Sequence, residues 1–333
     1  MFIEKAYTGK NNWFLYVVTI LIVFIATQLS GIPLAVYLFI CNPEAAMQGN
    51  IGTITSTNTG LALSLLTFVG GFFALFFCAK FLHKKNYLDI VTARPKFDWG
   101  RLFFGAAVWA ILTLISLAIT ILSSEDADIV FQFDPLNFFM LVLISILFLP
   151  FQTGFEEIMF RGYLMQGAAL FFKSKWISFL FIAILFGLMH ISNPEIKAFG
   201  VEVALPQYIL MGLILGFIAI MDDGLELAIG LHLANNFMAA ITFTSGQSLS
   251  WELFDNHYLH IGSLGSTNAR FIQRHEPDRL ASRCHHHVHC RSHLYRYLQQ
   301  KIQISERQHP SGGILFIKSA VILLIRKVHI RYE

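Results

Sequence analysis

Long apolar runs constrain the fold of this 333-residue chain more than any other feature. A helix needs about 20 apolar residues to cross a bilayer core of about 30 Å. Runs close to that length cover residues 13–40, 60–81, 102–122, 136–170, 175–191, 205–221 and 225–243. We therefore expect an all-α fold: a polytopic transmembrane helical bundle of about 7–8 spans around a membrane-embedded polar cavity.

The first run is too long for the apolar region of a signal peptide, which has about 7–15 residues. We interpret it as an uncleaved membrane anchor that bends near Gly31 and Pro33, because these residue types interrupt helices.

The composition excludes several classes of protein. Hydrophobic residues make up 55% of the chain and charged residues 14%, whereas a soluble domain carries about 25% charged residues. Disordered, collagen-like and disulfide-rich secreted chains are excluded on the same grounds. The net charge of +3 is too small an excess to indicate a nucleic-acid partner. Membrane lipid is the partner that this composition requires.

The distribution of Lys and Arg predicts the orientation. The loop after the second run is basic, whereas residues 41–59 contain no Lys or Arg and the charged residues of 123–137 are all acids. The basic side chains are Lys84, Lys85, Arg94, Lys96 and Arg101, and the acids are Glu125, Asp126, Asp128 and Asp134. We expect a multi-pass integral membrane protein with its N-terminus inside.

Three segments differ in composition. Residues 1–135 are N-terminal transmembrane helices and loops, and residues 136–244 hold the ionisable side chains that lie within apolar runs. Residues 245–333 form an atypical basic, His-rich tail. This tail contains half of the 24 Lys and Arg residues and most of the 13 His residues, but only three of the 33 Phe residues.

The most informative cluster is the segment from Glu156 to Arg161, because charged residues inside apolar spans are rare and mark functional sites. Glu157 and Arg161 are four residues apart, which favours an ion pair on one helix face. Glu156 is rotated from Glu157 by about 100°. Two neighbouring acids in different environments can provide one structural ion pair and one general base.

Two further clusters place imidazoles on helix faces. His190 follows Phe186 by four residues, and His232 precedes Asn236 by four residues. Asn235, three residues after His232, also stays a candidate partner. A base, two imidazoles and an amide donor are sufficient to activate a water molecule and stabilise an oxyanion, as peptide-bond hydrolysis requires.

The series Glu-Glu-x-x-x-Arg, Phe-x-x-x-His and His-x-x-x-Asn resembles the CAAX protease and bacteriocin-processing family of intramembrane proteases, over residues 145–243. The resemblance is to the bacterial members of the family and implies a protein of the bacterial cytoplasmic membrane. It also implies about eight spans around a water-accessible cavity, and it assigns a role to each matching residue. According to the resemblance, Glu156 is the general base that activates a water molecule, and His190 binds the same water. His232 and Asn236 bind the oxyanion. The supporting residues are Glu157, Arg161 and Phe186.

The residues of the three clusters are compatible with a zinc-dependent mechanism and with a metal-free one. Glu156, His190 and His232 could together bind zinc with an open position for water. Against this, a helical His-Glu-x-x-His zinc motif is absent from the sequence. We expect a metal-free, glutamate-type mechanism and no cofactor, with zinc as the alternative.

Two other classes of function compete with a protease. A non-catalytic binding or bacteriocin-immunity protein has no need of the Glu156 carboxylate. A proton-coupled transporter is expected to show internal symmetry, which the sequence lacks. A site at membrane depth implies a hydrophobic or lipidated peptide or protein substrate, and the sequence assigns neither its identity nor an oligomeric state.

The foreign composition of the tail leads to a first prediction. We hypothesise that a reading-frame shift near residues 266–270 replaces a final span. Sequencing of the source locus is expected to reveal a second frame there that encodes an apolar segment. An intact single frame across that point would contradict the hypothesis.

Overall fold

The computed structural model describes residues 1–41, 43, 57–123, 129–131, 133–193, 196, 199–242 and 259–261. The predictions about the tail, apart from residues 259–261, lie outside these residues. The same holds for the acids Glu125, Asp126 and Asp128 of the acidic loop.

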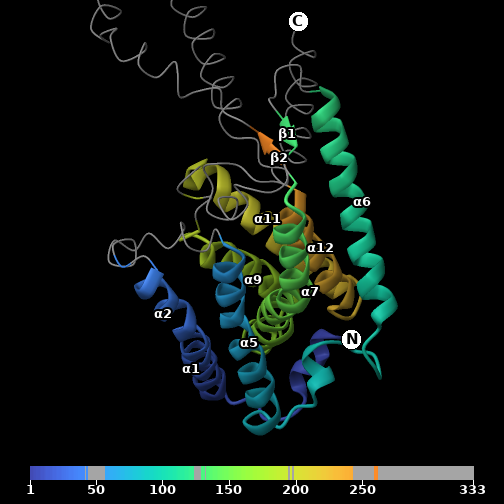
Figure 1. Cartoon of the computed structure of the whole chain (residues 1–333). Helices are drawn as coiled ribbons and strands as arrows, with labels where there is room; N and C mark the ends of the chain where they lie inside the picture. The colour runs from blue at the N-terminus through green and yellow to red at the C-terminus, as the bar shows by residue number, and fades with distance from the viewer. Residues whose placement is uncertain are drawn as a thin grey trace, which may run out of the picture.

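The described chain is a bundle of helices (Figure 1). Its main helices are α1 (Trp13–Ser30), α2 (Ile32–Cys41), α5 (Asn58–Phe81), α6 (Trp99–Ser123), α7 (Pro135–Glu157), α8 (Met165–Phe172), α9 (Lys175–Met189), α11 (Val201–Met221) and α12 (Glu226–Thr242). Short 3₁₀ turns η1 (Ile3–Tyr7) and η2 (Tyr87–Ile90) and a π-helical segment η3 (Ile158–Leu164) complete the helical part. β1 (Ile129–Phe131) and β2 (Leu259–Ile261) form one antiparallel pair. The all-α fold class is confirmed, with this pair of short strands as a small addition.

Within the described residues, five helical segments are long and apolar enough to cross a membrane, namely Trp13–Cys41, Asn58–Phe81, Trp99–Ile119, Pro135–Phe172 and Val201–Met221. α9, with 15 residues, is a shorter apolar helix, and α12 has 17 residues. Each predicted run therefore corresponds to a helix, and the expected 7–8 spans are consistent with this set. The first helical segment is interrupted at Gly31, as the sequence predicts.

The local sequence explains where the helices begin. Asp134 accepts a hydrogen bond from the Asn137 N–H and precedes Pro135, which is favourable in a first turn. Thr57 and Ser174 cap α5 and α9 in the same way. Lys173 ends α8 with a left-handed φ of 54°, which turns the chain sharply into α9.

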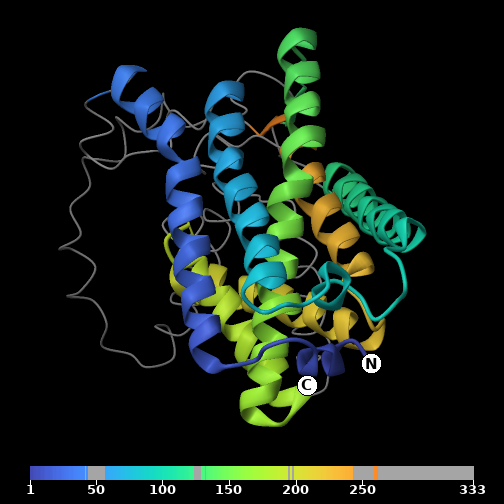
Figure 2. The same cartoon turned by 90° about the horizontal axis from the view of Figure 1, so that it is seen from below.

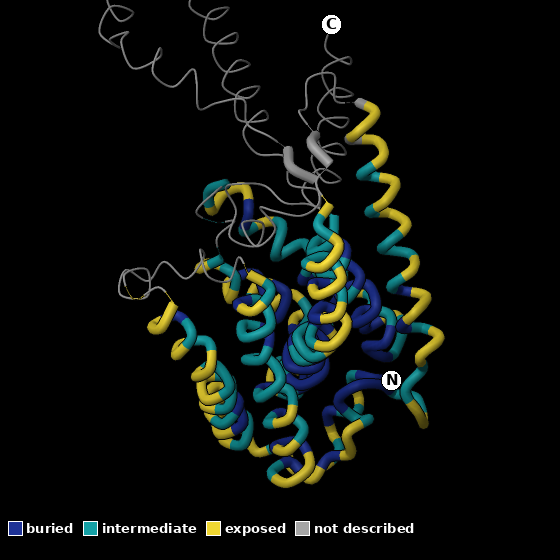
Figure 3. The backbone as a smooth tube through the Cα atoms, in the orientation of Figure 1, coloured by how far each residue is buried: buried dark blue, intermediate teal, exposed yellow. Residues whose placement is uncertain are grey.

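Buried residues are concentrated in α7, η3 and α12, whereas α1 and α6 expose much of their length (Figure 3). α7 packs between α5 and α12, α6 lies along α12, and α9 packs against α11. The exposed side chains of the outer helices are predominantly large and apolar, such as Phe24, Phe103 and Ile111. Such a surface is suited to contact with lipid, because exposure of a large apolar area to water is unfavourable.

Glycine allows two close backbone approaches near the centre. A Cβ atom on Gly162, in η3, would collide with the carbonyl oxygen of Ile90 in η2. One on Gly230, in α12, would collide with the carbonyl oxygen of Leu102 in α6. Small residues are common where membrane helices touch, since they let backbones pack closely.

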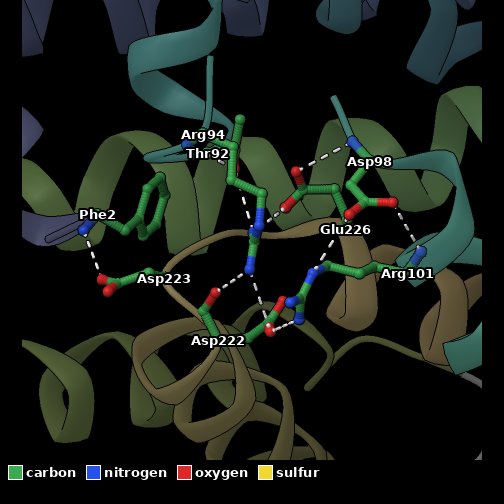
Figure 4. A network of polar contacts seen from close by, with 8 residues as sticks. All are labelled: Phe2, Thr92, Arg94, Asp98, Arg101, Asp222, Asp223 and Glu226. Atoms are coloured by element: carbon green, nitrogen blue, oxygen red, sulfur yellow. Dashed lines mark hydrogen bonds and ion pairs between the residues drawn. The ribbon is translucent and has the colours of Figure 1, made fainter. Parts of the chain in front are cut away.

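A network of ion pairs holds the start of α6 and the start of α12 together (Figure 4). Arg94 donates to the Glu226 carboxylate at 3.1 Å and to the Asp222 carbonyl oxygen at 2.5 Å. Arg101 also pairs with the Asp222 carboxylate. Glu226 is fully buried, so its Arg94 partner and the Asp98 N–H donor are necessary to offset its desolvation.

The N-terminal segment closes the same end of the bundle, as the view from below shows (Figure 2). The Phe2 N–H donates to Asp223 at 2.7 Å. The buried Lys85 ammonium donates to the carbonyl oxygens of Lys5 and Ala6. Burial lowers the pKa of Lys85 to about 8, because the charged form loses its hydration.

The contact at Gly162 generates a prediction. Gly162→Ala is expected to lower the stability of the protein by about 1–3 kcal/mol, because the added methyl group must displace the η2 backbone. Thermal unfolding in detergent micelles measures the effect. Gly100→Ala is the matched control, since Gly100 is exposed on α6 and its new Cβ would meet only the Asp98 side chain. Equal stability of the two variants would contradict the prediction.

Candidate functional site

The first cluster lies at the junction of α7 and η3. α7 ends at Glu157, and the chain continues without a break through η3 into α8. The Met165 N–H bonds to the Phe160 carbonyl oxygen, five residues back, which is the π-helical spacing. Single π-helical turns inside α-helices are rare and occur frequently at functional sites.

Glu157 is the central group of the site. Its Oε1 atom lies 2.9 Å from Arg161 Nη1 and 2.7 Å from His232 Nδ1. The ion pair expected from the four-residue spacing is therefore present, and the same oxygen also reaches across to α12. Glu157 and Arg161 are both almost completely buried. The contact with His232 joins two segments 75 residues apart.

The bond to Glu157 sets the chemistry of the His232 ring. An ionised carboxylate can only accept a hydrogen bond, so Nδ1 carries the proton. Nε2 then points towards Glu156, with 3.7 Å between Nε2 and Glu156 Oε2. That separation is too long for a direct hydrogen bond and allows a water molecule to bridge the two groups. Glu156 is 9% exposed and His232 is 5% exposed.

Phe186 packs against both sides of the site. The Arg161 guanidinium lies 4.0 Å from the centre of its ring, and the His232 ring lies 6.3 Å from that centre. A cation over an aromatic face is attracted by the ring electrons, most strongly where water is excluded. Phe186 thus helps to hold the buried Arg161 charge, which supports the auxiliary role that the resemblance gives it.

His190 lies just after the end of α9, with its ring centre 4.6 Å from that of Phe186. Its Nδ1 atom is 2.7 Å from the Phe186 carbonyl oxygen, and its ring stacks on Tyr208 of α11 at 4.4 Å. Among the described residues, no hydrogen bond or ion pair joins His190 to Glu156 or His232. The structure therefore brings Glu156, Glu157, Arg161 and His232 together, and His190 contacts the same Phe186 ring as His232 does.

Asn236 forms a second link between α7 and α12. Its Nδ2 donates to Gln152 Oε1 at 3.4 Å, one helical turn from the Glu156–His232 pair. Gln152 was not predicted, although its position four residues before Glu156 places it on the same helix face. Asn235, the alternative partner, points instead to Trp109 of α6.

The donor set fits zinc poorly in this arrangement. No group of three His, Cys, Asp or Glu side chains that could hold a metal ion occurs in the described part of the chain. Glu156 and His232 are neighbours, but His190 is directed elsewhere by Phe186 and Tyr208. We derive no catalytic step through a metal, and a chelator experiment tests the alternative directly.

An apolar cavity of about 920 Å³ lies beside the site, between α5, η2, α6, α7 and α12. Its wall includes Gly154 and Ile158 of α7 and Leu233 and Ala234 of α12, all close in sequence to the polar residues of the site. A pocket of this size and character can bury an apolar ligand. The polar, water-accessible cavity expected from the sequence stays a prediction, since this cavity is lined almost entirely by apolar side chains.

The comparisons with known proteins agree with the motifs. Residues 135–238 match the model of a family described as type II CAAX prenyl endopeptidase Rce1-like. This match covers all the predicted site residues and confirms the resemblance, and together with the apolar helices it supports an integral membrane protease. The chain is also 22% identical to the uncharacterized protein YyaK of Bacillus subtilis (strain 168), over 72% of this chain and 81% of that protein. No solved structure matches the chain.

The shared Glu157 oxygen generates a prediction about stability. Glu157→Gln is expected to cost about 3–5 kcal/mol, because it leaves the buried Arg161 without its counter-charge. The double variant Glu157→Gln/Arg161→Met is expected to be more stable than Glu157→Gln alone, since it removes the uncompensated charge.

Thermal unfolding of the single and double variants in one detergent measures both effects. Losses that simply add, with the double variant the least stable protein of the series, would contradict an ion pair as the central contact of the site.

Proposed function

We propose that the protein is an intramembrane endopeptidase that hydrolyses a peptide bond of a hydrophobic or lipidated peptide or protein by means of a glutamate-activated water. The single observation that carries the proposal is the chain of contacts from Arg161 through Glu157 and His232 to Glu156. The second carboxylate, Glu156, is a candidate base, and the buried, oriented imidazole next to it can hold the water that the base activates. The match of residues 135–238 to a family of endopeptidases supports the same reaction class.

In this proposal, Glu156 is the general base. One water molecule, bound beside the pair formed by Glu156 Oε2 and His232 Nε2, donates a hydrogen bond to each. Glu157 holds His232 in the tautomer whose Nε2 accepts. Glu156 takes a proton from the water as the water oxygen attacks the carbonyl carbon, so the proton moves to the carboxylate and a C–O bond forms.

The tetrahedral intermediate carries a negative oxygen that needs a donor. The Asn236 Nδ2 group is the donor closest to the site on α12, and its bond to Gln152 is long enough at 3.4 Å to be replaced easily. Collapse of the intermediate breaks the C–N bond, and Glu156 returns its proton to the leaving nitrogen. This assignment moves His232 from the oxyanion, where the resemblance places it, to the water.

His190 is the remaining member of the predicted catalytic set. Its Nδ1 is occupied by the Phe186 carbonyl oxygen, so only Nε2 is available to a water molecule or to the substrate. We therefore give His190 the role that the resemblance implies, which is to form a second hydrogen bond to the attacking water. On the substrate side, the apolar cavity supports the hydrophobic class, because its wall is continuous with the backbone that carries Glu157 and His232.

The proposal predicts a specific loss of activity. Glu156→Gln is expected to lower kcat by about 10²–10⁴-fold, the usual contribution of a general base, while the protein stays folded. Cleavage of a fluorogenic peptide library by protein purified in detergent measures the rate. Glu202→Gln is the matched control, because Glu202 is exposed at the start of α11, and it is expected to keep full activity.

A chelator arm of the same assay tests the metal. Activity is expected to be unchanged after chelation. Activity that disappears with chelator and returns with zinc would replace the glutamate mechanism by a metal-dependent one. Full activity of Glu156→Gln would contradict the proposed base, and a wild-type protein that binds peptides without cleaving them would favour a binding or immunity function.

A further inference from the structure

A chain of side-chain hydrogen bonds runs from α6 through α12 to α7. Trp109 Nε1 donates to Asn235 Oδ1 at 3.1 Å, Asn235 Nδ2 donates to Asn236 Oδ1 at 3.0 Å, and Asn236 Nδ2 donates to Gln152 Oε1 at 3.4 Å. The helices that carry these residues lie side by side, with α12 between α6 and α7 (Figure 1). None of the predicted roles of the site uses Trp109 or Gln152, and Asn235 was only an alternative to Asn236.

The chemistry of the first group fixes the direction of the whole chain. An indole N–H is a donor and has no acceptor atom, so Asn235 must present its oxygen to Trp109. The Asn235 amide nitrogen then donates to Asn236, so Asn236 must accept this hydrogen bond with its oxygen. The remaining group of Asn236 is its NH₂, which faces α7. A donor at one end of the chain therefore makes Asn236 a donor at the other end.

This direction matters because an amide can rotate by half a turn. With its oxygen towards α7, Asn236 would place a partial negative charge where the proposed reaction develops an oxyanion, and would repel it. With its NH₂ group there, it stabilises the oxyanion. The two orientations of an isolated Asn side chain fill the same space, so packing alone does not choose between them.

The receiving end is positioned for the same reaction. Gln152 and Glu156 lie four residues apart on α7, and Asn236 and His232 lie four residues apart on α12. The Gln152–Asn236 and Glu156–His232 pairs are consequently two neighbouring rungs between antiparallel segments. The two rungs are one helical turn apart, about 5.4 Å, so a carbonyl oxygen that accepts from Asn236 in place of Gln152 can lie between them, with its carbon next to the proposed water.

We propose that Trp109 and Asn235 are positioning residues that hold the Asn236 amide with its NH₂ group towards the reacting carbonyl. The inference rests on the proposed function for its catalytic meaning, and on the hydrogen-bond chain for its structure. It assigns α6, which lies outside the segment that matches the family model, a part in the catalytic step.

The kinetic test uses one isosteric variant and one smaller aromatic variant. Asn235→Asp keeps an acceptor for Trp109 but cannot donate to Asn236, so kcat is expected to fall about 100-fold, close to the loss of one oxyanion donor, with KM within about twofold of wild type. Trp109→Phe keeps an aromatic ring and loses the donor, and its kcat is expected to fall about 10-fold. The double variant is expected to be no worse than Asn235→Asp, because both changes break one chain.

Trp176→Phe is the matched control, since Trp176 is an exposed residue of α9, and it is expected to keep wild-type kcat. Losses that multiply in the double variant, or a rise in KM without a fall in kcat, would overturn the positioning role.

A second measurement is independent of activity. The Trp109 indole N–H, assigned in an NMR spectrum by its disappearance in Trp109→Phe, is expected to exchange slowly with solvent deuterium and to lose that protection in Asn235→Leu. Unchanged protection in Asn235→Leu would overturn the hydrogen-bond chain itself. Protection that behaves as expected in a protein that cleaves no peptide would retain the chain and refute the proposed function on which its catalytic role rests.

Discussion

The contact between the Glu157 carboxylate and its two partners determines the arrangement of the site. One buried oxygen accepts from the Arg161 guanidinium, on its own helical segment, and from the His232 imidazole, on α12. Neither bond alone would offset the free-energy cost of burying a charge, because desolvation of an ionised group costs several kcal/mol. Together with the Phe186 ring above Arg161 they compensate that cost and fix the distance between α7 and α12.

The rest of the bundle supports this contact at a distance. The Arg94, Asp222 and Glu226 network fixes the first turn of α12, six residues before His232 (Figure 4). The close approach of Gly162 to the backbone of η2 helps to fix the position of the π-helical segment η3, which follows Glu157. Two elements far apart in the sequence are thus placed relative to each other by polar contacts at one end of the bundle and by small residues near its centre.

The sequence predicted the parts of this structure that depend on local spacing. The apolar runs gave the helices, Gly31 marked an interruption, and the four residues between Glu157 and Arg161 predicted their ion pair. The contact of Glu157 with His232 could not be predicted, because it depends on how α7 and α12 pack. The same applies to Trp109, whose partner is 126 residues away. The position of His190 beside Phe186 depends on the turn after α9 and on Tyr208, neither of which has a signature in the sequence.

The most direct test of the account follows the oxygen atom of the attacking water. A single turnover in H₂¹⁸O, analysed by mass spectrometry of the product and of the Glu156 peptide, is expected to place one solvent oxygen in the new carboxylate of the product and none in the Glu156 side chain. Label in the Glu156 carboxylate would show that this residue attacks the substrate itself, and it would contradict a water held by Glu156 and His232.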